Sequence, residues 1–237
     1  MYFDNPVLAA LPVVISCPRS GLNWVRYCVE KTGGLPTPGL RVLIDGNAAS
    51  SWAFLRTHDA QGLLRRPESA AWSIVPPQAF AERAILLLIR DPRELIGRIL
   101  NRGTNVNQIG LIASNLNFFF AHRTERSRVF YYQDFIRNPA SMMKILEALA
   151  VKKSDGAAIH LTDLEAGWDD MRRASRDVYN VNQDASGGSM TQDEPDNPHF
   201  HRMRAPAKAL ARHWENVRQE LTPDSLEALR CYLDAQE

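Results

Sequence analysis

Residues Pro18–Trp24 read Pro-Arg-Ser-Gly-Leu-Asn-Trp and closely follow a short apolar run that ends at Ser16. The apolar run predicts a buried strand, and the residues after Gly21 predict an amphipathic helix. A strand, a tight turn and a helix start in this order expose backbone N–H groups, and the helix dipole adds positive potential at the same place. Arg19 adds a permanent charge with a forked set of donors. The segment therefore predicts a phosphate or sulfate site.

A second arginine follows the most apolar strand candidate of the chain. The segment Ala84–Arg90 reads Ala-Ile-Leu-Leu-Leu-Ile-Arg, and an unbroken apolar run is typical of a parallel strand covered on both faces. Asp91 and Pro92 then have the residue types that begin a helix. A charge at the end of a buried strand needs a partner, which for Arg90 is either a bound anion or a salt bridge to Asp91 or Asp134.

Strands and helices alternate along the chain, which predicts an α/β fold with a doubly wound parallel sheet flanked by helices. Ligands of such sheets lie outside the carboxyl ends of the strands, so Arg19 and Arg90 are expected near one crevice. The other expected elements are strands at Arg41–Asp45 and Arg128–Asp134, and helices that begin after Asn138-Pro139 and Thr222-Pro223.

Length and composition predict a single domain over residues 1–237, because 45% hydrophobic residues suffice for one sizeable core. A polar stretch at about 180–205, rich in Gly, Asp, Asn and Pro, predicts a mobile loop. The net charge of +1 gives no general attraction to nucleic acid or anionic lipid. Three cysteines without a C-x-x-C pair favour a reducing compartment, and no apolar stretch approaches about 18 residues. We therefore expect a cytoplasmic protein without membrane insertion, for which a homodimer is compatible with the sequence.

Two other phosphate-binding loops fit this segment poorly. A Walker loop needs G-x-x-x-x-G-K-[ST], but only Gly21 is present and no lysine follows it directly. A cysteine phosphatase needs an arginine six residues after its cysteine, and Asn23 occupies that position after Cys17.

The segment Pro18–Trp24 resembles the loop P-[KR]-S-G-[TS]-[TS]-W, with which sulfotransferases bind the 5′-phosphosulfate of 3′-phosphoadenosine 5′-phosphosulfate (PAPS). Three further elements follow in the order of that family. Arg56-Thr57-His58 resembles the K-T-H element with the catalytic base, and Ile89–Glu94 resembles the element that binds the 3′-phosphate. Phe130–Asp134 with Asn138-Pro139 resembles the later Y-E-D…x-P element. The four matches span residues 12–150, more than half of the chain, and imply a P-loop-like, sulfotransferase-type three-layer architecture.

This resemblance implies a PAPS-dependent sulfotransferase. Such an enzyme moves the sulfuryl group of PAPS to a hydroxyl, less often an amine, of a small-molecule, lipid or carbohydrate acceptor. No metal is required, because arginines and loop amides neutralise the developing charge. The alternatives are a nucleotide kinase with a degenerate loop and a nucleotide-binding module without turnover.

The resemblance also implies the catalytic roles. Arg19 would stabilise the negative charge that grows on the bridging oxygen as its bond to sulfur breaks. His58 would accept the proton of the acceptor hydroxyl, because histidine titrates in the required range. Asp45 is the competing base, since several carbohydrate sulfotransferases use a carboxylate. Asp59 either orients His58 or is solvated.

The nucleotide contacts implied by the resemblance involve residues from several elements. Arg90 would bind the 3′-phosphate, while Trp24 and Tyr132 would contact the adenine or else pack in the core. Arg98 stands where the family has a serine, and it either binds phosphate or forms an i,i+4 ion pair with Glu94. The remaining expected contacts are Ser20, Gly21, Leu22 and Asn23 at the 5′-phosphate, with Leu22 and Asn23 in place of hydroxyl residues, and Arg202 or Arg204 at the 3′-phosphate.

Overall fold

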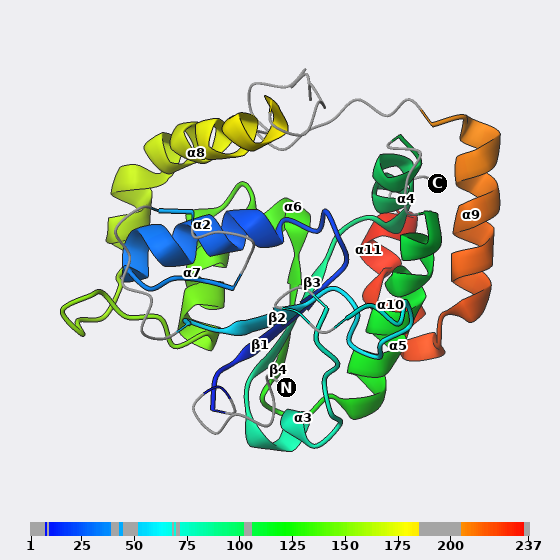
Figure 1. The fold of residues 1–237 in the computed structure, drawn as a ribbon, viewed down its shortest axis with the longest axis horizontal. Coiled ribbons are helices and arrows are strands. Elements are labelled where there is room, and N and C mark those ends of the chain that lie inside the picture. The colour runs from blue at the N-terminus through cyan, green and yellow to red at the C-terminus, as the bar shows by residue number, and fades with distance from the viewer. Residues whose placement is uncertain are drawn as a thin grey trace. The chain divides into compact units, whose positions relative to one another are not determined.

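A computed structural model describes residues 8, 10–38, 43–44, 52–67, 69, 72–101, 106–184 and 205–234, and for residues 176–184 it describes the backbone alone. The chain divides into two compact units. Figure 1 labels the helices and strands of which they consist. Unit 1 consists of Met1–Ser20, Phe54–Phe130 and Met203–Glu237, and unit 2 of Gly21–Ala53 and Tyr131–Arg202. Among the described residues, no helix has the length and apolar character needed to cross a membrane.

Unit 1 is built on a four-stranded parallel sheet with the strand order β2-β1-β3-β4. In the register of the sheet, Val14 lies opposite Arg56 on one side and opposite Leu86 on the other. Every residue of the two inner strands β1 and β3 is buried, which explains their unbroken apolar sequences. The strands are β1 at Val13–Ser16, β2 at Leu55–Thr57, β3 at Ile85–Ile89 and β4 at Ser127–Tyr131.

The strand order reverses between β1 and β3. From β1 the chain continues to β2 on one side, and from β3 it continues to β4 on the other. In open parallel sheets, ligands bind at the carboxyl ends of the two strands that flank such a reversal. Here those ends lead directly into Cys17 and Arg90.

Helix α9 and the 3-10 helix η1 pack against α4, which follows β3. Pro92 is the first residue of α4, and Asp91 accepts a hydrogen bond from the N–H of Arg93 at 2.9 Å, which caps the helix start. Helix α9 packs against α4 and α5, and the hydroxyl of Tyr232 in α11 donates to the Ile89 carbonyl at 3.4 Å. The elements are α3 at Ala79–Glu82, α4 at Pro92–Asn101, the 3-10 helix η1 at Val106–Gly110, α5 at Leu111–His122, α9 at Ala207–Glu220, α10 at Pro223–Ala228 and α11 at Arg230–Leu233.

Unit 2 is helical, and α2 packs against α7 and α8 in it. Helix α2 begins after Gly21 with φ +84° and ends at Gly34 with φ +66°, and both angles lie in the left-handed region that favours glycine. Gly21 also has no room for a side chain, because a Cβ would lie 2.6 Å from Cδ2 of Tyr132. The elements are α2 at Leu22–Gly33, α6 at Tyr132–Phe135, α7 at Pro139–Ala148 and α8 at Leu161–Asp184.

The structure confirms the expected strands at β1 and β3 and the expected starts of α7 and α10. Asn138 accepts a hydrogen bond from the N–H of Ala140 at 2.8 Å, and Thr222 accepts one from Ser225 at 3.4 Å. Both residues are followed by proline, as predicted. The parallel sheet confirms the α/β class.

Two strand predictions are wrong in part. The predicted strand Arg128–Asp134 ends at Tyr131, because Tyr132 and Phe135 are buried on one face of the helical turn α6. Leu43 and Ile44, from the predicted strand Arg41–Asp45, form a bend, and positions 41, 42 and 45 lie outside the described residues. Their N–H groups donate to the carboxylate of Glu30 instead of to a neighbouring strand. The strand that pairs with β1 on this side is β2.

The backbone of α8 extends to Asp184, so the first residues of the stretch predicted as a mobile loop are helical. The rest of that stretch, 185–204, lies outside the described residues.

Candidate functional site

The predicted anion loop begins with a tight turn after β1. The N–H of Ser20 donates to the carbonyl of Cys17 at 3.2 Å, which places Pro18 and Arg19 in the middle of the turn. Arg19 has a φ of +80°. A proline followed by a residue with positive φ is the pattern of a type II turn, whose second central position favours glycine because a Cβ is strained there. An arginine at this position marks the turn as a candidate functional site.

Ser20 adds an unused polar group to the turn. The side chain is 1% exposed, and its Oγ has no hydrogen-bond partner among the residues that the structure describes. A buried hydroxyl without a partner costs about 1–3 kcal/mol. The hydroxyl is therefore a donor that a ligand can satisfy, two residues before Leu22, the first residue of α2.

Cys17, the first residue of the turn, is a buried thiol. Its Sγ lies 3.6 Å from the carbonyl of Leu111. Burial raises the pKa of the Cys17 thiol to about 12, although the hydrogen bond from Asn115 acts in the opposite direction. A thiol that stays protonated is neither a nucleophile nor a metal ligand. The structure thus supplies a second argument against a cysteine phosphatase.

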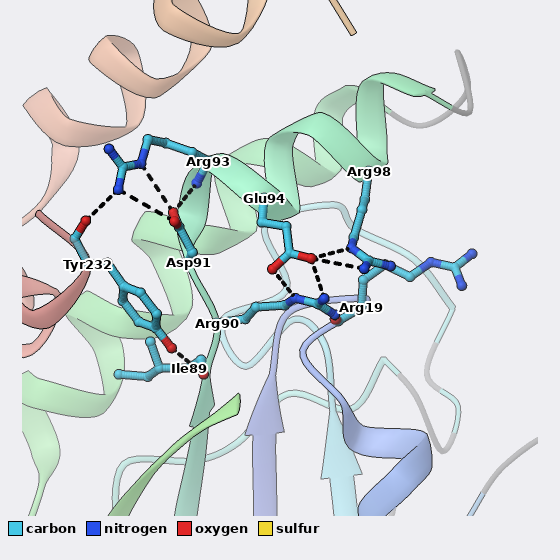
Figure 2. Close-up of polar contacts among 8 residues, drawn as sticks. All are labelled: Arg19, Ile89, Arg90, Asp91, Arg93, Glu94, Arg98 and Tyr232. Atoms are coloured by element: carbon cyan, nitrogen blue, oxygen red, sulfur yellow. Dashed lines mark hydrogen bonds and ion pairs between the residues drawn. The ribbon is translucent and has the colours of Figure 1, made fainter. Parts of the chain in front are cut away.

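Arg90 links the end of β3 to this turn. Its NH1 donates to the carbonyl of Arg19 at 2.8 Å. Figure 2 draws the two residues beside each other. The expectation that Arg19 and Arg90 lie close together is confirmed. The binding of phosphate by either residue stays a prediction.

The side chains of Arg90 and Arg98 converge on Glu94 (Figure 2). Arg90 donates from Nε to Oε2 at 2.7 Å and from NH2 to Oε1. Arg98 donates from Nε and NH2 to Oε1 at 3.1 and 2.9 Å, which confirms the ion pair expected as one alternative. Burial of the carboxyl raises the pKa of Glu94, but the charges and hydrogen bonds of the two arginines outweigh it, so this pKa lies below its ordinary value. The carboxylate is therefore ionised at neutral pH.

The other acidic residues considered for Arg90 have different surroundings. Asp91 forms an ion pair with Arg93 at 3.3 Å, and Asp134 is exposed on α6 in unit 2. The carboxylate that pairs with Arg90 is that of Glu94.

His58 follows β2 and is half-buried. Its Nδ1 lies 2.9 Å from the Ser16 carbonyl oxygen and 3.2 Å from the Ser16 Oγ, and its Nε2 lies 3.5 Å from NH1 of Arg56. A carbonyl can only accept a hydrogen bond and a guanidinium can only donate one. Both contacts therefore favour the same tautomer, with the hydrogen on Nδ1 and the lone pair on Nε2. Such an imidazole can accept a proton at Nε2.

Two buried polar side chains shape the loop that carries His58. Asn115 of α5 donates from Nδ2 to the His58 carbonyl at 2.9 Å and accepts from the Ala60 N–H at 3.0 Å. The carboxylate of Asp59 accepts from the backbone N–H groups four and five residues later, at 2.7 and 2.8 Å. Asp59 is thus neither solvated nor bonded to the His58 ring, and both alternatives considered for it are wrong.

The predicted adenine contacts belong to unit 2. Trp24 is fully buried, stacks on Tyr27 with centroids 6.0 Å apart and meets Trp168 edge-on at 5.2 Å. Its Nε1 donates to the Phe135 carbonyl at 3.2 Å, so the structure shows the core-packing alternative for this residue. Tyr132 is also buried and packs against Phe135 at 5.8 Å. Contact of either residue with adenine stays a prediction.

The other predicted contacts of α2 are at its start. Leu22 is buried, and Asn23 is exposed and accepts a hydrogen bond from NH1 of Arg26 at 3.4 Å. Asp45, Arg202 and Arg204 lie outside the described residues. Among the described residues, no group of three or more His, Cys, Asp or Glu side chains is arranged to hold a metal ion.

Sequence reasoning missed the roles of Asn115 and Ser16, and it missed that Glu94 pairs with Arg90 as well as with Arg98. A signal for Asn115 was its position as a polar residue in the apolar helix α5, where it is completely buried. A signal for Glu94 was its i,i+4 spacing to both Arg90 and Arg98. No local pattern indicated that Ser16 would hold the His58 ring, because the two residues are 42 positions apart.

Comparison with known proteins adds no relative: no protein-family model matches the chain, and no curated protein is significantly similar to it. The family resemblance therefore rests on the four sequence motifs.

Proposed function

We propose that this chain is a PAPS-dependent sulfotransferase. The observation that carries the proposal is the position of three motifs at the carboxyl ends of the neighbouring strands β2, β1 and β3. The Ser16 carbonyl is hydrogen-bonded to His58, and the Arg19 carbonyl is hydrogen-bonded to Arg90. The candidate base, anion turn and phosphate arginine are thus joined within unit 1, as a transfer between a nucleotide and an acceptor would require.

In this proposal the turn after β1 holds the 5′-phosphosulfate. The unpartnered Oγ of Ser20 supplies a hydrogen bond, and Arg19 neutralises the charge that develops on the leaving phosphate. The positive φ of Arg19 strains a residue that carries a Cβ, and in this proposal that strain is part of the function. Arg90 binds the 3′-phosphate. The contacts that the resemblance assigns to unit 2 stay predictions.

The proposed transfer is a single in-line displacement. The acceptor oxygen forms a bond to sulfur while the bond between sulfur and the bridging oxygen breaks, and the electron pair leaves with adenosine 3′,5′-bisphosphate. The acceptor proton passes to Nε2 of His58, which carries the lone pair in the tautomer that the contacts of Ser16 and Arg56 favour. The Arg56 contact at 3.5 Å is long, so an acceptor hydroxyl can replace it.

The test combines binding and transfer. Isothermal titration with adenosine 3′,5′-bisphosphate should show binding, and sulfur-labelled PAPS should transfer label to at least one class in a panel of phenols, alcohols and sugars. A chain that binds no nucleotide would refute the proposal. Binding without any transfer would favour the non-catalytic module, and binding of Mg²⁺-ATP without affinity for the bisphosphate would favour the kinase.

A further inference from the structure

We propose that Glu94 is an internal anion, which occupies the phosphate-binding edges of Arg90 and Arg98 in the ligand-free chain and is replaced when a phosphate group binds. The identification of that phosphate as the 3′-phosphate of a nucleotide rests on the proposed function. The exchange between carboxylate and phosphate does not.

The first argument is the geometry of the two guanidinium groups. Each arginine turns its Nε and NH2 atoms toward the carboxylate of Glu94. Nε of Arg90 lies 2.7 Å from that carboxylate, and NH2 and Nε of Arg98 lie 2.9 and 3.1 Å from it. This edge of a guanidinium group forms the paired hydrogen bonds with which arginine recognises both carboxylates and phosphates. Glu94 therefore uses the same donors that a phosphate would use.

The second argument is burial. The side chains of Arg90 and Arg98 are 3% and 4% exposed, whereas that of Glu94 is 27% exposed. A buried guanidinium is costly without an anion beside it, so both arginines need one in the free and in the bound state. Glu94 is the member of the cluster that can turn into water without burying its charge.

The third argument is that Arg90 has an anchor besides Glu94. The bond from its NH1 to the Arg19 carbonyl uses a different nitrogen from the two that contact the carboxylate. Arg90 can therefore keep its position beside the turn when the carboxylate leaves. A phosphate would then find the guanidinium already oriented.

The exchange predicts the direction in which phosphate affinity changes when the Glu94 charge is removed. A ligand that must displace an internal competitor binds more weakly than it would to the open site. Removal of the Glu94 charge should therefore strengthen phosphate binding. If Glu94 instead only oriented the two arginines, its removal should weaken phosphate binding.

The test compares the wild-type chain, Glu94→Gln and Glu227→Gln by isothermal titration. Glu227 is a matched control because it also lies in unit 1 and pairs with an arginine, Arg230, but is 72% exposed. The probes are inorganic phosphate, adenosine 3′,5′-bisphosphate and adenosine 5′-phosphate. We expect Glu94→Gln to bind the first two at least about tenfold more tightly, with less than about threefold change for the third. Glu227→Gln should match the wild type for all three.

A double variant, Glu94→Gln with Arg98→Gln, tests whether the phosphate binds at this cluster. It should bind inorganic phosphate less tightly than Glu94→Gln alone. If Glu94→Gln does not fold, Glu94→Asp applies the same test, because the shorter carboxylate reaches the two arginines less well.

Unchanged or weaker binding of inorganic phosphate by the folded variant would overturn the inference. An equal gain for all three probes would support the internal anion but would overturn the assignment of the cluster to a 3′-phosphate. Tighter binding of inorganic phosphate without any binding of the bisphosphate would support the internal anion and refute the nucleotide function. The two proposals can thus fail separately.

Discussion

The guanidinium group of Arg90 donates a hydrogen bond to the carbonyl oxygen of Arg19, 71 residues earlier in the chain, at a distance of 2.8 Å. This bond joins the ends of β3 and β1, the two strands that flank the reversal of the sheet order. The same bond fixes the carbonyl group of Arg19, whose backbone is strained by its positive φ. Arg90 and the turn after β1 are therefore mechanically linked.

Replacement of Arg90 by alanine should weaken both the fold and the nucleotide site. The change removes the bond to Arg19 and leaves Glu94 with one of its two arginine partners. Because the side chain is buried, we expect the free energy of unfolding to fall by about 3 kcal/mol or more. Affinity for adenosine 3′,5′-bisphosphate should fall at least about tenfold in isothermal titration.

Arg93→Ala is the control for this prediction. Arg93 lies three residues further along, and its guanidinium group bonds to Asp91 and to the Tyr232 carbonyl. It should bind the bisphosphate as the wild type does. Equal affinity of Arg90→Ala and the wild type would contradict the assigned role of Arg90.

Arg19→Gly should change stability and activity in opposite directions. Glycine adopts a φ near +80° without strain, which offsets its higher entropy in the unfolded chain, so unfolding should become less favourable by up to about 1 kcal/mol. Turnover should fall about 100-fold, because the charge at the bridging oxygen is lost. Chemical denaturation and label transfer from PAPS measure the two effects.

A second arginine provides the comparison. Arg65 is exposed and has a φ of +48°, so Arg65→Gly should relieve backbone strain without loss of turnover. If Arg19→Gly kept full turnover, the strain at Arg19 would have no connection to catalysis.

The sequence predicted correctly those elements whose formation depends on residues close together in the chain. The apolar runs of β1 and β3 and the cap-and-proline pairs at Asn138 and Thr222 act over a few residues, and the structure has these elements where they were expected. The closeness of Arg19 and Arg90 also followed, because parallel strands end at one edge of a sheet.

The sequence was uninformative where a distant side chain decides the local structure. Leu43 and Ile44 have the composition of a strand, but the carboxylate of Glu30 binds their N–H groups from 13 and 14 residues away. The carboxylate partner of Arg90 was also predicted wrongly, because Asp91 and Asp134 were the two carboxylates considered for it and Glu94 was considered only for Arg98. Only the path of α4 brings Glu94 against both arginines.

The three cysteines should differ sharply in reactivity. Cys231 is exposed, whereas burial raises the pKa of Cys17 to about 12 and raises the pKa of Cys28 well above its ordinary value. A disulfide reagent at pH 8 should therefore modify one thiol of the native chain quickly, and the other two only after unfolding. Cys231→Ser should abolish the fast reaction. Two or more fast thiols in the native chain would contradict the buried positions.

The same pKa shifts predict a loss of stability at high pH. The folded chain keeps the protons of Cys17 and Cys28 to a higher pH than the unfolded chain, whose thiols ionise near about 8.5. The stabilisation is complete below that value and is lost as the pH rises toward about 12. Denaturation of the wild type and of Cys17→Ala at a series of pH values should show a smaller decline in the variant.

His58→Ala should lower kcat without weakening nucleotide binding. The imidazole is held by the Ser16 carbonyl at Nδ1, so its removal deletes the basic Nε2 and leaves the turn after β1 intact. A general base contributes about 10²–10⁴-fold in rate, and kcat should fall by that factor while the Kd for adenosine 3′,5′-bisphosphate stays the same. The acidic limb of the pH profile of kcat/KM should also disappear. His122→Ala is the matched control, because His122 packs on Phe80 and Phe118 in unit 1. If His58→Ala retained near-normal turnover, the base would have to be sought elsewhere, and Asp45 would be the next residue to replace.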